Sequence, residues 1–122
     1  MITQEQYKDL EDRTVSLGNY LNIDAKKIEL EEEELRTQAP GFWDDTKAAE
    51  EQMKKVKALQ FWVNHYAELQ SMVNEVKLSL EFFHDQMVTE QEVDDAYAKA
   101  LDTLEKLELK NMLQAEEDSM DC

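Results

Sequence analysis

Helix-breaking residues are rare in this sequence: two glycines, Gly18 and Gly41, and one proline, Pro40, occur among 122 residues. Two of the three are adjacent, so one clear loop is predicted in the segment TQAPGFWDD, residues 37–45. Elsewhere apolar residues recur at steps of three and four, the period of a helix face, and no segment of useful length alternates with period two. The chain is therefore predicted to be all-α.

The first predicted helix spans residues 3–36. It begins with a capping box, because Thr3 and Gln6 have the spacing at which each side chain binds a free backbone N–H of the first turn. Gly18 and Asn19 interrupt the helix, so we expect a kink or a short break there. Its predicted apolar stripe is Tyr7, Leu10, Leu17, Leu21, Ile28 and Leu35.

Two further helices are predicted, over residues 45–86 and 89–117. Either Asp44 or Asp45 caps the first of them, and a second capping box, Thr89 with Glu92, begins the other. The longer stripe has a mean step close to the ~3.5 residues of a coiled-coil seam. Its residues are Met53, Val56, Leu59, Val63, Tyr66, Leu69, Val73, Val76, Leu80, Phe83 and Met87. The last stripe is Val93, Tyr97, Ala100, Leu104 and Leu107, with Leu109 and Leu113 on a rotated face.

Long amphipathic helices with short connections pack antiparallel, each on its neighbour in the chain. The predicted fold is an elongated antiparallel three-helix bundle with coiled-coil character, forming a single helical domain over residues 1–122. The final segment, AEEDSMDC, is acidic and has no helix stop. We interpret this segment as a junction at which a longer chain has been cut.

Charge and composition exclude several classes of protein. The 29 acidic residues against 13 basic ones give a net charge of −16, which disfavours generic nucleic-acid binding. A single cysteine, Cys122, excludes a disulfide scaffold and a cysteine zinc site. No run approaches the ~18–20 apolar residues of a membrane span, and the polar N-terminus does not resemble a secretory signal. A cytoplasmic protein with no membrane partner is predicted.

No catalytic, cofactor or metal site is predicted. A glycine-rich phosphate loop is missing, and His65 and His84 lie 19 residues apart on one predicted helix, too far to share a metal. The glutamates at 29 and 31–34 are interpreted as a solvated face, because neighbouring carboxylates on a helix point in different directions. An enzyme with a buried carboxylate site is the least favoured class, since the stripes are largely apolar.

Two groups of residues are candidates for partner contacts. Lys54, Lys55 and Lys57 either pair with nearby glutamates or form a small contact patch for RNA or an acidic protein. Phe42 and Trp43, in the predicted loop, either plug one end of a helical core or anchor another domain.

Three segments resemble a known family. They are YLNIDAKKIELEEEE (20–34), PGFWDDTKAAE (40–50) and LELKNMLQAEEDSMDC (107–122). Over essentially its whole length the chain resembles the N-terminal domain of the bacterial peptide chain release factor 2 family, among the class-I release factors. The resemblance implies a helical arm that acts in translation termination. Its implied partners are the protein and rRNA of the large-subunit stalk base, the class-II release factor GTPase and the rest of the factor.

The motifs that carry codon reading and catalysis in that family, Ser-Pro-Phe and Gly-Gly-Gln, do not occur here, so this chain is not expected to be an enzyme. With three helices running down, up and down, the N-terminus and the loop near residues 85–90 lie at one end. We expect the ribosome contact there, through Gln86, Thr89, Glu90 and Gln91, and an interdomain anchor at Phe42 and Trp43. The alternative is a stand-alone helical scaffold or an oligomerising coiled-coil protein.

Overall fold

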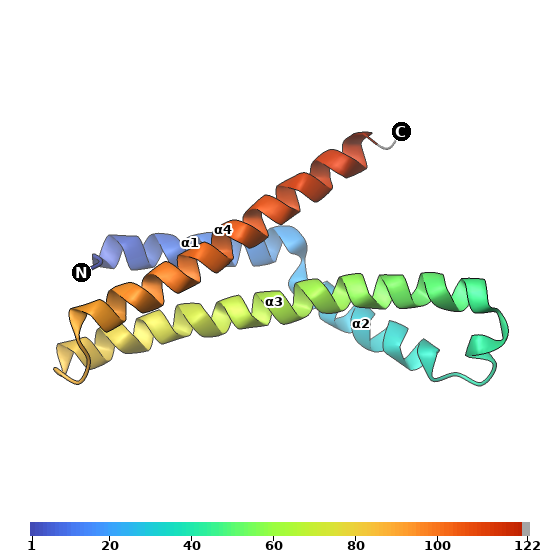
Figure 1. Cartoon of the computed structure of the whole chain (residues 1–122), viewed down its shortest axis with the longest axis horizontal. Coiled ribbons are helices and arrows are strands. Elements are labelled where there is room, and N and C mark those ends of the chain that lie inside the picture. Colours follow the sequence, from blue (N-terminus) through green and yellow to red (C-terminus); the bar gives the residue numbers. More distant parts are fainter. Residues whose placement is uncertain (121–122) are drawn as a thin grey trace. The chain divides into compact units, whose positions relative to one another are not determined.

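The computed structural model describes the backbone of residues 1–120 and the side chains through Gln114. The chain forms four α-helices and one short 3-10 turn, and the described residues contain no strand (Figure 1). The elements are α1 (Gln4–Leu21), α2 (Ile23–Thr37), η1 (Phe42–Asp44), α3 (Thr46–His84) and α4 (Glu90–Met120). The all-α prediction is confirmed, with four helices in place of three. The predictions for the side chains of the acidic tail and for Cys122 lie outside the described residues.

The first predicted helix is divided at Asn22, not at Gly18 and Asn19. Asn22 has left-handed backbone angles, φ 55° and ψ 53°, a conformation that asparagine tolerates better than most residues. The Lys26 ammonium donates a hydrogen bond to the Leu21 carbonyl oxygen (2.7 Å), which satisfies one of the free carbonyls at the end of α1. Gly18 lies inside α1, so the glycine does not cause the break.

The structure consists of two compact units. Unit 1 contains Met1–Leu17 and Glu68–Cys122, and unit 2 contains Gly18–Ala67. None of the helices in the described residues is long and apolar enough to cross a membrane.

Unit 1 joins the first part of α1, the second part of α3 and α4. The loop between α3 and α4 makes these two helices antiparallel, and α1 starts at the end where α3 finishes (Figure 1). Arg13 on α1 binds Glu108 on α4 through two hydrogen bonds, of 2.5 Å from Nη2 and 3.3 Å from Nε. The core follows the predicted stripes, because their residues Leu10, Leu17, Leu69, Val73, Val76, Val93, Ala100, Leu104 and Leu107 are buried. Ile2, which precedes α1 and belongs to none of the stripes, is buried as well. Leu109 and Leu113, on the rotated face of α4, are exposed.

Unit 2 is an antiparallel pair, α2 and the first part of α3, connected through η1. The buried apolar residues are Leu21, Ile23, Ala49, Val56, Leu59, Trp62 and Tyr66. The stripe predicted for the first helix is wrong at two positions, because Ile28 is 60% exposed and Leu35 is 67% exposed. The left-handed Asn22 changes the phase of the helix, so Ile23 enters the core in their place.

One glutamate of the predicted solvated face is buried. Glu33 is 3% exposed and accepts a hydrogen bond from the side-chain amide of Gln52 on α3. Two cations surround it, Arg36 at 3.2 Å and Lys55 at 3.6 Å. The buried charge is therefore paired and hydrogen-bonded, as burial of a carboxylate requires. The solvated-face prediction is wrong for Glu33.

Candidate functional site

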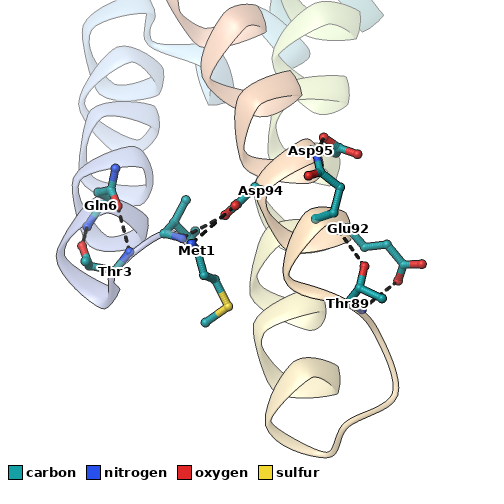
Figure 2. A network of polar contacts seen from close by, with 9 residues as sticks. Met1, Thr3, Gln6, Thr89, Glu92, Asp94 and Asp95 are labelled. Atoms are coloured by element: carbon teal, nitrogen blue, oxygen red, sulfur yellow. Dashed lines mark hydrogen bonds and ion pairs between the residues drawn. The ribbon is translucent and has the colours of Figure 1, made fainter.

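One end of unit 1 gathers three chain segments: the start of α1, the end of α3 and the start of α4 (Figure 2). Both predicted capping boxes lie here and are confirmed. Thr3 and Gln6 exchange hydrogen bonds of 2.8 and 3.1 Å. Thr89 and Glu92 exchange bonds of 3.4 and 3.2 Å. We call this end, residues 1–7 and 80–95, the tip.

Asp94, which lies on α4, binds the N-terminus of the chain. The backbone N–H of Ile2 donates to Asp94 Oδ1 at 2.9 Å, and the amino group of Met1 lies 3.5 Å from Asp94 Oδ2 (Figure 2). Ile2 is buried beside these bonds. The start of α1 is thereby fixed against α4 by both polar and apolar contacts.

The turn after α3 closes as a Schellman motif without a glycine. Gln86 has a positive φ of 63° and its N–H donates to the Phe83 carbonyl oxygen (2.9 Å). The N–H of Met87 donates to the Phe82 carbonyl oxygen (2.8 Å). These are the two bonds that satisfy the last carbonyls of a helix in this motif. They set the path of the chain between α3 and α4.

The structure brings the four predicted tip residues together. Gln86, Thr89, Glu90 and Gln91 are all exposed, in the turn and at the beginning of α4. The Thr89 hydroxyl is used by the helix cap, and the Gln91 side chain donates to Asp95 (2.7 Å). Their contact with a partner remains a prediction.

A groove between α1 and α3 opens at the same tip, and sequence reasoning missed it. It consists of two adjoining hollows, of ≈ 560 and ≈ 510 Å³, which share Gln4, Leu80 and His84. Tyr7 lines the first hollow, and its hydroxyl donates to Glu11 (2.8 Å). Burial, followed by this bond and the charges of Glu11 and Glu81, raises the pKa of Tyr7 to about 12.

The predicted lysine patch lies in unit 2, not in the unit that forms the tip. Lys54, Lys55 and Lys57 are on α3 and are exposed. Lys55 pairs with Glu29 at 3.3 Å as well as with Glu33. Charge pairing with nearby glutamates therefore describes Lys55, while a role of the three lysines in binding a partner remains a prediction.

Phe42 and Trp43 form the short turn η1 in unit 2. Their rings meet edge to face, with centroids 5.0 Å apart at 86°. Phe42 is half-buried, but Trp43 is 62% exposed. A hydrophobic plug does not describe Trp43, since most of its surface faces solvent. Their role as an anchor for another domain remains a prediction.

Among the described residues, no group of three histidine, cysteine, aspartate or glutamate side chains could hold a metal ion. Comparison with known proteins decides the family, because the PCRF domain matches residues 26–122, most of the chain. The chain belongs to the PCRF domain family.

This PCRF domain is similar to proteins named peptide chain release factor 2. It is 33% identical to that of Haemophilus influenzae over 93% of this chain and 32% of the relative. It is 29% identical to that of Aliivibrio fischeri, over 98% of this chain and 33% of the relative. It is 31% identical to that of Shewanella woodyi, over 94% of this chain and 32% of the relative. The predicted family resemblance is confirmed. The chain spans about a third of the length of these relatives.

The groove of this PCRF domain could not be predicted from its sequence. Leu80 and Tyr7 were assigned to core stripes, and both are in fact half-buried at the edge of the core, where they line the hollow. Glu81 and Asp85 look like ordinary exposed helix residues. Only the packing of α1 against α3 brings these side chains to one place.

Proposed function

We propose that this chain is the N-terminal helical domain of a peptide chain release factor and acts in translation termination in the cytoplasm. The relatives named peptide chain release factor 2, matched over nearly the whole chain, support this role. The chain has no adjacent glycines and hence no Gly-Gly-Gln motif. The domain therefore binds and positions, and hydrolysis of peptidyl-tRNA belongs to the rest of the factor.

In this proposal the tip contacts the stalk base of the large ribosomal subunit, both its protein and its rRNA, and so positions the full-length factor. The observation that carries it is the exposed tip, where Gln86 lies in a turn closed by a Schellman motif and Gln91 lies in the first turn of α4, which begins with a capping box. A preorganised surface loses little conformational entropy when it binds. The class-II release factor GTPase is the second proposed partner. Phe42 and Trp43 are proposed to anchor the rest of the release factor to this domain.

Photo-crosslinking tests the proposed contact. A crosslinking amino acid is placed at Gln86 or Gln91, and in a matched control at Gln70, which is exposed on α3 of the same unit. Each variant is mixed with bacterial ribosomes, and the crosslinked products are identified by mass spectrometry. We expect stalk-base products from both tip positions and none from Gln70. Equal products from all three positions, or none from the stalk base, would overturn the contact.

A scaffold that oligomerises is the second candidate, and one observation favours it. Ile28 and Leu35 are seven residues apart on α2 and both are exposed, the spacing of a coiled-coil seam. Analytical ultracentrifugation separates the two functions. A monomer at micromolar concentration supports the release-factor domain, and an obligate oligomer supports the scaffold.

A further inference from the structure

The groove at the tip has an apolar floor that is open to solvent. Leu80, Phe83 and Val88 line it and are each half-buried. Met87, next to Val88 in the chain, is 71% exposed. Apolar side chains that gather at an open hollow on the surface are typical of a site that contacts another protein.

The rim of the first hollow of the groove is acidic. Glu81 and Asp85 line the first hollow together with one lysine, Lys77, and the carboxylate of Glu11 lies one hydrogen bond away from Tyr7. The raised pKa of Tyr7 has part of its cause in the charges of Glu11 and Glu81, so carboxylates act on the interior of the hollow. Such a surface repels phosphate and attracts lysine and arginine.

We infer that this groove binds a short segment of a partner protein in which an aliphatic or aromatic side chain is flanked by lysine or arginine. The apolar side chain covers Leu80 and Phe83, and the basic groups face Glu81 and Asp85. The inference rests on the proposed function in that the groove reaches Gln86, one of the residues proposed to contact the ribosome. It assigns the contact made through the groove itself to a basic protein segment, and it leaves contact with rRNA to other residues of the tip.

Nuclear magnetic resonance titration of the whole 122-residue chain tests the inference. The probe is the amidated peptide Lys-Lys-Leu-Leu-Lys-Lys, compared with a peptide in which both leucines are serine. We expect the leucine peptide to shift amide signals of the groove residues and to bind about tenfold more tightly than the serine peptide, because only leucine buries apolar surface.

Charge-reversal variants localise the binding. Glu81→Lys with Asp85→Lys changes the rim, and Glu75→Lys with Glu105→Lys makes the same change in net charge at exposed positions of α3 and α4. We expect the rim variant to lose about tenfold in affinity for the leucine peptide and the control less than twofold. Circular dichroism verifies that both variants keep their helices.

Three results would overturn the inference. They are equal binding of the two peptides, equal loss in the two variants, and groove shifts produced by a ten-residue uridine oligonucleotide in place of the peptide. Failure here is distinct from failure of the proposed function. Stalk-base crosslinks without peptide binding reject the groove alone, whereas peptide binding without crosslinks rejects the ribosome contact.

Discussion

The ring of Tyr66 on α3 occupies the space that a side chain at Gly18 on α1 would need. A Cβ atom built at Gly18 would lie 2.5 Å from Cζ of Tyr66 and closer still to its hydroxyl oxygen. Tyr66 is only 6% exposed, so the ring is held within unit 2 and has little room to move away. Gly18 therefore permits close packing of two helices inside unit 2.

Replacing Gly18 by alanine is expected to destabilise the protein, although alanine is the better helix former. The gain in helix propensity, ~1 kcal/mol, is smaller than the cost of overpacking a buried ring, ~1–3 kcal/mol. Urea denaturation should show a lower midpoint for Gly18→Ala. The control, Asn19→Ala at the neighbouring exposed position, should not lower the midpoint. In a Tyr66→Phe background the cost of Gly18→Ala should shrink, and an undiminished cost would contradict the proposed clash.

Gln86→Gly is expected to stabilise the protein. The positive φ of Gln86 costs an L-residue roughly 1 kcal/mol relative to glycine, and the Schellman bonds use only its backbone N–H. The free energy of unfolding should rise by several tenths to about 1 kcal/mol in chemical denaturation. A matched change in the first turn of α4, Gln91→Gly, should lower it. If both variants are destabilised, the left-handed turn is not the relevant conformation.

Features determined by neighbouring residues in the chain could be predicted. Each capping box needs only two residues three positions apart, and both were found from sequence. The core stripes of α3 and α4 were predicted for the same reason, since Leu69, Val76 and Leu104 follow the helical period and are buried. Most of the helical fold could therefore be predicted from local chemistry and hydrophobic periodicity.

Features determined by tertiary packing could not be predicted. A glycine was the expected point of the helix break, but Gly18 accommodates Tyr66 and the break falls on Asn22. The resulting change of phase turned Ile28 outward. The groove depends on the meeting of α1 and α3, which no spacing within one helix reports.

The pKa of Tyr7, raised from 10.0 to about 12, predicts a loss of stability at high pH. The folded state holds the Tyr7 proton more tightly than the unfolded state. The contribution to stability is thus fully present below pH 10 and disappears as the pH rises from about 10 to 12. A spectrophotometric titration should show a late ionisation that belongs to Tyr7. Tyr7→Phe should remove this late phase, and Glu11→Gln should shift it to lower pH, since the carboxylate is among its causes.

Glu33 is expected to be the one glutamate of α2 whose removal is costly. In Glu33→Ala the amide of Gln52 loses its acceptor, Arg36 loses its ion pair with Glu33, and Lys55 keeps only its ion pair with Glu29. The expected loss in the free energy of unfolding is about 1–3 kcal/mol, because the carboxylate is buried and hydrogen-bonded. Glu33→Gln keeps an acceptor oxygen of similar shape and should lose less.

Glu32→Ala is the matched control for the Glu33 variants. Glu32 is exposed on the same helix and carries the same charge, so its removal should change the free energy of unfolding by less than ~0.5 kcal/mol. Both alanine variants reduce the negative charge equally, so relief of repulsion in a chain of net charge −16 cancels in the comparison. Equal midpoints for Glu33→Ala and Glu32→Ala in urea denaturation would show that the buried carboxylate does not hold α2 against α3.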